Sequence, residues 1–144
     1  MKMTFRWYGD NDPIPIEYIA QIPLMDGIVS AVYDVPPGKV WSSESILKIK
    51  NAAEKHGLTF EVVESVPVHE DIKLGKKSRD EYIEVYQENI RRLGKAGVKV
   101  ICYNFMPVFD WLRSQLDYKN PDGSTSLVYR QEQILKMYPK TGDL

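Results

Sequence analysis

The chain has 144 residues, a length that fits a single domain, and 43% of them are apolar, which is enough to bury a core. Its 19 basic and 20 acidic side chains give a formal net charge of −1, with no long run of either sign. This balance argues against a nucleic-acid footprint and against a polybasic membrane anchor.

The first part of the chain predicts a strand, a short helical turn and a second strand. Residues 4–8 form a β-type run that ends in a turn. Pro15 suits the first position of a brief helical turn, which closes before Pro23. Residues 28–33 are a second β-rich run, and the Pro-Pro-Gly turn at 36–38 follows it.

A stronger helix signal comes next. Ser42 or Ser43 is a suitable N-cap, and an apolar stripe at three-and-four spacing follows in Ile46, Ile49 and Ala53. Gly57 suits the left-handed conformation just beyond the helix. Residues 59–65 then predict a third strand.

A second helix and a fourth strand follow in the same order. Ser78 and Glu81 have the spacing of a capping box, and an apolar face follows in Tyr82, Val85, Tyr86, Ile90 and Leu93. Gly97 ends this helix, and residues 98–104 predict the fourth strand. We therefore expect two helices that each lead directly into a strand.

The region 105–144 departs from this alternation of strands and helices. Residues 105–118 are aromatic and irregular, and residues 120–123 (Asn-Pro-Asp-Gly) are a strong turn signal that suits a hairpin. A helical piece is expected around residues 130–137, before Pro139. No low-complexity segment or domain linker is visible.

Short connections from each helix to the next strand are typical of βαβ crossovers and hence of a parallel sheet. Periodicity alone leaves two folds open, an open α/β sheet and half of a barrel. The loops that follow the strands are the longer ones, so elaborated loops gather at the carboxyl edge. Both folds carry their functional sites at that edge.

The sequence predicts a cytoplasmic protein without membrane contact. One cysteine, Cys102, cannot form an intrachain disulfide framework. No apolar run approaches the roughly 20 residues needed to cross a bilayer, and residues 1–6 lack the apolar region of a secretory signal.

Two polar or aromatic residues close the first predicted strand. Arg6 offers a planar fork suited to a carboxylate, and Trp7 offers an apolar wall for a sugar face. The alternative for this pair is an ordinary ion pair and a packed aromatic ring.

Three further candidates follow the later strands. His69 lies just past the third strand, where it suits binding a substrate hydroxyl or moving a proton, although a lone loop histidine is more often simply solvated. Tyr103 and Asn104 end the fourth strand and alternate in direction. The neighbouring Cys102 reads as a small hydrophobe. The spacing of histidine and cysteine matches no metal motif, and no phosphate-binding loop or nucleophile elbow is present.

Five segments of the chain resemble the mannonate dehydratase family: residues 5–9 (FRWYG), 21–23 (QIP), 64–69 (ESVPVH), 102–111 (CYNFMPVFDW) and 122–124 (DGS). The resemblance implies dehydration of D-mannonate to 2-dehydro-3-deoxy-D-gluconate in hexuronate and glucuronate catabolism. It also implies a xylose-isomerase-like (β/α)8 TIM barrel and a divalent metal, Mn2+ or alternatively Mg2+ or Fe2+. On this basis Arg6, Trp7, His69, Tyr103 and Asn104 are expected to bind the sugar acid.

The family's metal ligands belong to the second half of its barrel, so no metal ligand and no catalytic residue is assigned in this chain. A complete barrel needs eight strands in about 250 residues. We therefore expect residues 1–144 to be the N-terminal part of one TIM-barrel domain, truncated after about four strands and inactive alone. Open sheet edges favour a homo-oligomer. The alternatives are an inactive half-barrel interaction module and a sugar isomerase or epimerase on the same type of barrel.

Overall fold

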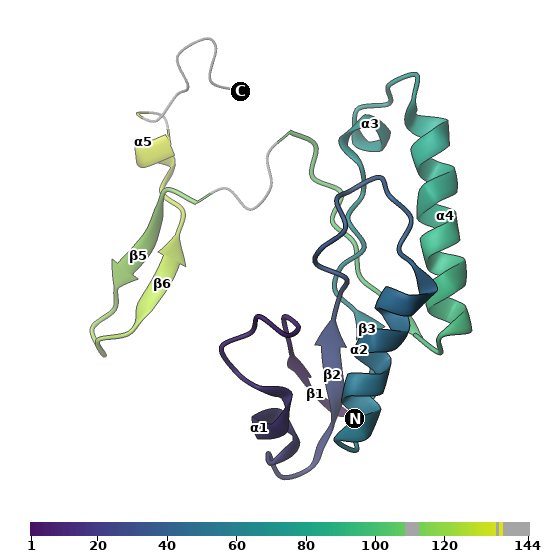
Figure 1. Cartoon of the computed structure of the whole chain (residues 1–144). Coiled ribbons are helices and arrows are strands. Elements are labelled where there is room, and N and C mark those ends of the chain that lie inside the picture. The colour runs from purple at the N-terminus through teal and green to yellow at the C-terminus, as the bar shows by residue number, and fades with distance from the viewer. Residues whose placement is uncertain (109–112, 135, 137–144) are drawn as a thin grey trace. The chain divides into compact units, whose positions relative to one another are not determined.

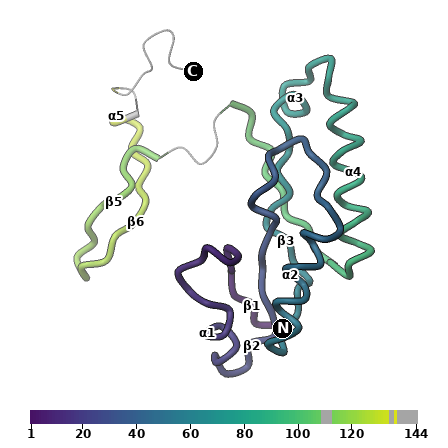
Figure 2. Tube along the Cα trace, in the orientation of Figure 1, coloured from purple at the N-terminus to yellow at the C-terminus, as the bar shows by residue number. Residues whose placement is uncertain are grey.

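The computed structural model describes residues 1–108, 113–134 and 136, and the chain divides into two units, Met1–Pro107 and Val108–Leu144 (Figure 1). The first unit is an α/β arrangement with a parallel sheet, and the second contains an antiparallel hairpin. Figure 2 traces the backbone of both units from the N-terminus onward. Within the described ranges, every helix is too short or too polar to cross a bilayer.

Four strands build the sheet of the first unit in the order of the chain: β1 (Met3–Arg6), β2 (Met25–Ser30), β3 (Thr59–Val63) and β4 (Val100–Ile101). Each neighbouring pair is parallel, which confirms the parallel sheet predicted from the sequence. All four strands therefore end at one carboxyl edge.

Strands β1, β3 and β4 are shorter than predicted, and β4 most of all. The sequence predicted a strand over residues 98–104, but the Val98 amide donates to the Leu93 carbonyl and so belongs to the turn that closes the preceding helix. Lys99 and Cys102 still donate backbone hydrogen bonds to β3, at 2.8 Å each, on either side of the two-residue strand. β2 keeps its predicted length but begins at Met25 and ends at Ser30, three residues earlier at each end than predicted.

The two faces of the sheet differ in what covers them. Phe5, Ile28 and Phe60 are register partners across three strands. Ile28 and Phe60 belong to the buried core, and the partly buried Phe5 packs against it. The next row along the strands consists of Arg6, Val29, Val62 and Val100. Because successive residues of a strand point to opposite faces, this second row lies on the other face. It is only partly covered, and Val100 is 49% exposed.

Strand β3 carries one extra residue relative to β2. Ile28 pairs with Phe60 and Val29 pairs with Val62, so Glu61 has no register partner on β2. This arrangement is a β-bulge. Glu61 instead forms ion pairs with Lys2 at 2.8 Å and Lys99 at 2.5 Å.

The two predicted helices are present as α2 (Ser43–Lys55) and α4 (Arg79–Lys95). Ser42 caps α2 as predicted, because its hydroxyl accepts from the Ser45 amide at 2.9 Å. The predicted capping box of α4 is wrong. Ser78 has a helical backbone, and its hydroxyl donates instead to Asp71 Oδ2 at 2.6 Å.

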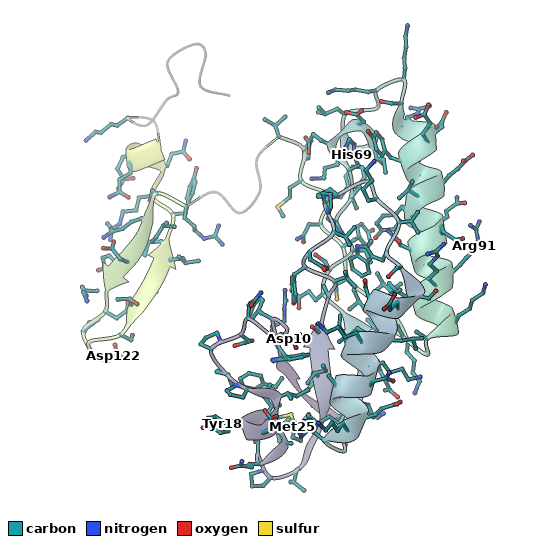
Figure 3. The ribbon with its side chains drawn as sticks, viewed as in Figure 1. Asp10, Tyr18, Met25, His69, Arg91 and Asp122 are labelled. Carbon is teal, nitrogen blue, oxygen red and sulfur yellow. The ribbon has the colours of Figure 1, made fainter. Side chains whose placement is uncertain are left out.

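Two short helices complete the first unit. In α1 (Ile16–Ala20), Pro15 is the N-cap rather than the first helical residue. Ile16 and Ile19 are buried, whereas Tyr18 points away from the sheet and is exposed (Figure 3). The sequence did not predict α3 (Glu70–Lys73), a single turn that begins just after His69.

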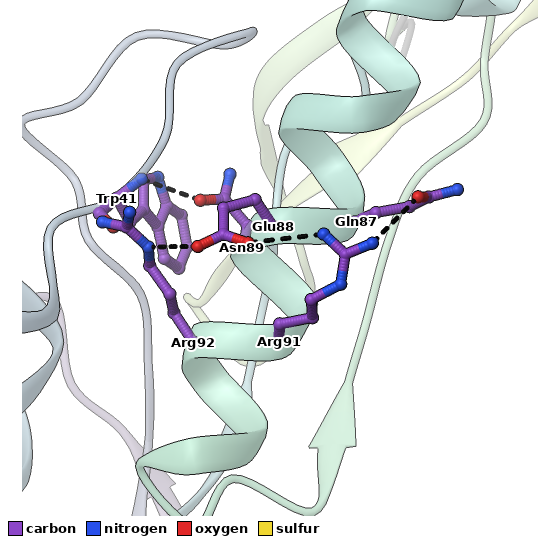
Figure 4. A network of polar contacts seen from close by, with 6 residues as sticks. All are labelled: Trp41, Gln87, Glu88, Asn89, Arg91 and Arg92. Carbon is purple, nitrogen blue, oxygen red and sulfur yellow. Dashed lines mark hydrogen bonds and ion pairs between the residues drawn. The ribbon is translucent and has the colours of Figure 1, made fainter.

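The core holds one buried polar side chain from α4. Asn89 is 3% exposed and accepts from the Trp41 amide at 2.7 Å (Figure 4). It also donates to the Lys39 carbonyl at 3.1 Å. Arg92 donates to the Trp41 carbonyl at 3.0 Å. These bonds fix the segment before α2 against α4, because they satisfy both backbone groups of the buried Trp41.

The second unit contains β5 (Gln115–Lys119), β6 (Thr125–Val128) and the short helix α5 (Gln131–Ile134). The two strands pair antiparallel around the predicted turn, in which Gly123 has φ +84°. This confirms the hairpin but corrects the expectation that residues 105–118 are irregular throughout. The helical piece predicted over residues 130–137 is α5; residues 135 and 137 lie outside the described part of the chain.

Candidate functional site

Arg6 stands at the carboxyl end of β1 among three polar or aromatic partners. Its Nη1 lies 2.9 Å from Glu64 Oε2, and its Nε donates to the Tyr33 hydroxyl at 3.4 Å. The guanidinium carbon is 4.9 Å from the centre of the Tyr8 ring, a cation–π distance. The fork is thus held in place, with the half-exposed Glu64 carboxylate on one of its nitrogens.

Trp7, the neighbour of Arg6, packs into the core and is 4% exposed. Its carbonyl accepts from the Ser30 hydroxyl at 2.7 Å. Its indole Nε1 is buried, and no described residue accepts a hydrogen bond from it. A buried donor of this kind costs about 1–3 kcal/mol if it has no partner. Trp7 therefore offers a sugar ring much less surface than an exposed wall would.

A cavity of about 180 Å³ opens beside Trp7, between the segments that follow β1 and β2 and one side of α2. Its lining includes Tyr8, Asp10, Tyr33 and Lys48. Lys48 Nζ lies 2.6 Å from Asp10 Oδ2, so the two charges at the rim neutralise each other. The cavity combines aromatic and polar groups, as small-molecule sites do.

His69 is half-buried and follows β3 by six residues, at the start of α3 (Figure 3). Its Nδ1 accepts from the Asp71 amide at 3.2 Å, which makes it the N-cap of that turn. Its ring stacks on Tyr82 of α4, with ring centroids 3.5 Å apart and planes 13° apart. Tyr82 therefore covers one face of the His69 ring, and the Asp71 amide fixes its Nδ1 edge.

Tyr103 and Asn104 follow β4. Tyr103 is 62% exposed and Asn104 is half-buried. Burial raises the pKa of Tyr86 on α4, and the nearby Tyr103 phenol raises it further. Tyr103 is thus close enough to α4 for its phenol to act on that of Tyr86. Cys102 is half-buried and hydrogen-bonds to β3 through its backbone amide, as a structural strand residue does.

The structure arranges the predicted residues as two groups. Arg6 and Trp7 lie together at the ends of β1 and β2, whereas His69 and Tyr103 both lie beside α4, through Tyr82 and Tyr86. The sequence did not identify Glu64, Tyr33 or Tyr82 as members of these groups. Glu64 and Tyr33 were detectable in principle, because each lies within a few residues of a strand's carboxyl end.

The arrangement of possible metal ligands can be described for residues 1–108, 113–134 and 136. In those ranges, no group of three or more histidine, cysteine, aspartate or glutamate side chains is placed to hold an ion. The described side chains thus do not form the ligand set that a divalent metal requires.

Known proteins match the chain over nearly its whole length. The model of the D-mannonate dehydratase family matches residues 1–141. Mannonate dehydratase 2 of Halalkalibacterium halodurans is 57% identical over 144 residues, and the mannonate dehydratase of Streptococcus equi subsp. zooepidemicus is 56% identical. Both alignments include 100% of this chain but 42% and 40% of the relatives, so the chain spans about two-fifths of their length.

One solved structure has the same backbone arrangement. The crystal structure of mannonate dehydratase from Streptococcus suis serotype 2 superposes with a TM-score of 0.89 and 57% sequence identity. The superposition covers 93% of this chain and 38% of that one.

Proposed function

The chain belongs to the D-mannonate dehydratase family, and from this premise we propose that it forms part of an enzyme that removes water from D-mannonate. The product is 2-dehydro-3-deoxy-D-gluconate, and the reaction serves hexuronate catabolism in the cytoplasm. The observation that carries this proposal is the family match over residues 1–141, together with relatives of that name at 56–57% identity.

We also propose that the four-stranded sheet is a portion of a (β/α)8 barrel. A parallel sheet whose strands follow one another in chain order is what a barrel of this type requires. The partly covered row of Val29, Val62 and Val100 supports the same idea, because in a closed barrel it would face the interior. Four further strands would come from other residues.

The dehydration requires three functions from the active site. The substrate carboxylate must be held, the proton on the adjacent carbon must pass to a base, and the departing hydroxyl must receive a proton to leave as water. Arg6 is suited to binding the substrate carboxylate, since a guanidinium binds a carboxylate with charge-assisted hydrogen bonds. Trp7, His69, Tyr103 and Asn104 are proposed to contact the remainder of the sugar acid.

A divalent cation, Mn2+ or alternatively Mg2+ or Fe2+, is proposed to stabilise the negative charge that develops when the proton is removed. The described residues do not offer it a ligand set. As the family resemblance implies, its ligands are proposed to lie in the second half of the barrel, and the 144-residue chain alone is expected to be inactive.

A coupled assay tests the proposed function. D-mannonate and Mn2+ are added in parallel to the 144-residue chain and to a longer protein that contains it, and the 2-keto-3-deoxy product is measured. We expect metal-dependent product from the longer protein and none from the chain. Absence of product from the longer protein would overturn the dehydratase proposal, and product from the homogeneous chain would show that its own residues suffice.

A second candidate is an inactive interaction module, in which the sheet pairs with another polypeptide. The specific observation in its favour is the exposed apolar surface on the sheet, with Val100 49% exposed. A chain that forms a stable complex with a second copy or with a separate half-barrel, and that never yields product in either form, would favour this candidate.

A further inference from the structure

One ring nitrogen of His69 is already occupied within the protein. The Asp71 amide donates to His69 Nδ1 at 3.2 Å. A backbone N–H is a donor, so Nδ1 must be the unprotonated nitrogen of the ring. In the neutral imidazole the proton then resides on Nε2, and the capping bond selects this tautomer.

Two contacts fix the orientation of the same ring. One face stacks on Tyr82, with the centroids 3.5 Å apart. At the edge, a Cβ placed on Gly38 would come within 2.7 Å of His69 Cδ2 and 2.7 Å of Tyr82 Cε1. The loop after β2 therefore lies against both rings at a position that excludes every side chain. The ring has little freedom to flip and exchange its two nitrogens.

Asp71, whose amide donates the capping bond to His69, is itself held in place. Asp71 accepts from the Ser78 hydroxyl at 2.6 Å and pairs with Lys76 at 3.2 Å. Lys73, in the same helical turn, donates to the Met106 carbonyl at 3.2 Å, which ties α3 to the segment after β4. The hydrogen bond that fixes the tautomer thus rests on a connected set of contacts and not on one loop.

The opposite edge of the ring is different. Among the described residues, none forms a hydrogen bond with Nε2, and the His69 side chain is half-buried. Nε2 is not among the buried polar atoms that lack a partner, so it remains accessible to solvent or ligand. His69 follows β3 at the carboxyl edge of the parallel sheet, where the functional side chains of such folds gather.

We propose that His69 donates a hydrogen bond from Nε2–H to an oxygen of the sugar-acid substrate, and that the capping bond on Nδ1 keeps it a donor rather than a proton-accepting base. The inference rests on the proposed function and adds a direction to the contact. An imidazole that presents N–H binds a hydroxyl or carboxylate oxygen without removing a proton from the substrate. The base of the reaction is then a different group.

The competing explanation is that His69 is a structural cap and no more. Two substitutions separate the explanations, because asparagine and glutamine each copy one nitrogen of histidine. The Asn side-chain oxygen is placed like Nδ1 and is a good N-cap, but it does not reach the Nε2 position. The Gln amide reaches the Nε2 position as a donor but copies the cap poorly. His56→Asn is the matched control, since His56 ends α2 and faces Glu17 at 3.6 Å.

The kinetic test uses a longer, active protein that contains the chain. We expect His69→Asn to lower kcat/KM for D-mannonate about tenfold, with only the small decrease in melting temperature that follows from loss of the ring stacked on Tyr82. His69→Gln should retain more kcat/KM than His69→Asn despite a lower melting temperature, and His56→Asn should match the wild type. A His69→Asn enzyme with wild-type kcat/KM would overturn the donor role while leaving the proposed function intact.

Nitrogen NMR on the wild-type protein provides a test that no misfolded variant can obscure. We expect His69 Nδ1 to have the shift of an unprotonated nitrogen and Nε2 that of a protonated one, and added D-mannonate to move the Nε2 resonance. A protonated Nδ1, or an Nε2 resonance that D-mannonate leaves in place, overturns the inference. If Nε2 responds but no product forms, the dehydratase proposal fails and the donor role stands. If neither occurs, both fail.

Discussion

Arg6 Nη1 lies 2.9 Å from Glu64 Oε2, and this ion pair joins the end of β1 to the residue that follows β3, across the intervening β2. A carboxylate already rests on the fork that we propose for a substrate carboxylate. Glu64 is half-exposed and bonds one nitrogen, so it orients the guanidinium without occupying all of its donors.

Replacement of Arg6 by alanine should affect substrate use more than folding. The Arg6 and Glu64 side chains are 32% and 52% exposed, and such pairs contribute about 0–1 kcal/mol to stability. Loss of a charge-assisted bond to a bound carboxylate costs about 1.5–3 kcal/mol, or roughly 10- to 150-fold in kcat/KM. Lys2→Ala, which removes a comparable ion pair with Glu61, is the control. Unchanged kcat/KM in a folded Arg6→Ala enzyme would remove Arg6 from the site.

Asn89→Leu should destabilise the first unit by about 1–3 kcal/mol, because the Trp41 amide and the Lys39 carbonyl lose their partner in the core. Urea unfolding followed by tryptophan fluorescence measures the change. Gln87→Ala, on an exposed position of the same helix, should stay within about 0.5 kcal/mol of the wild type. Equal stability of the two variants would contradict a structural role for the Asn89 amide.

Gly38→Ala and Gly57→Ala should differ although both glycines have positive φ angles, +80° and +73°. Alanine in this backbone region costs about 1–2 kcal/mol at either position. At Gly57 the new Cβ meets no atom within 4 Å, whereas at Gly38 it comes within 2.7 Å of the His69 and Tyr82 rings. Overpacking adds about 1–3 kcal/mol at Gly38 alone. Equal melting temperatures would show that the two rings move aside freely.

Acid should weaken the α3–α4 connection through Asp71. The hydrogen bond from Ser78, and then the contact with Lys76, lower the pKa of Asp71 below its ordinary value of 3.8. A lowered folded pKa stabilises the fold above pH 3.8, and this contribution is lost as the pH falls through the lower folded value. Asp71→Asn and Ser78→Ala should therefore both show a shallower loss of unfolding free energy below pH 3.8 than the wild type. A wild-type slope in both variants would contradict this assignment.

The 144-residue chain should associate rather than remain a monomer. In the described part of the chain, β1 and β4 are the end strands of the sheet, and Val100 is half-exposed on its less covered face. Unpaired strand edges and apolar patches recruit partners. Sedimentation at micromolar concentration should give a dimer or larger species. A monodisperse 16.6 kDa monomer with cooperative unfolding would contradict the expectation.

The sequence predicts local structure well where one residue decides the backbone. The Ser42 hydroxyl hydrogen-bonds only with Ser45 in the first turn and caps α2, and Gly57 adopts the positive φ that ends the helix. The capping box at Ser78 fails because a residue seven positions earlier, Asp71, takes its hydroxyl. A rule based on residue spacing within one helix cannot predict that contact, because Asp71 belongs to α3 and not to α4. The same limit applies to α3, whose cap is a histidine and whose single turn is too short for a periodic pattern.

The candidate site follows the same division. Position at the end of a strand identified Arg6 and His69 from the sequence. Their partners were not identified. Tyr33 lies just past the end of β2, where it was detectable in principle, whereas Tyr82 is the first residue of the apolar stripe of α4. A tyrosine in such a stripe is typical of a core residue, and nothing in its spacing indicates that its ring stacks on the His69 imidazole.

Because of the bulge at Glu61, the register between β2 and β3 depends on the number of residues in β3 and not on which residue occupies position 61. Phe60 and Val63 pair with Ile28 and Ser30, two residues apart, and both are buried although they are three apart in their own strand. Any replacement of Glu61 preserves this frame. Deletion of residue 61 would turn every later residue of the strand to the opposite face of the sheet. Val63 would then leave the core, and Glu64 would point away from Arg6.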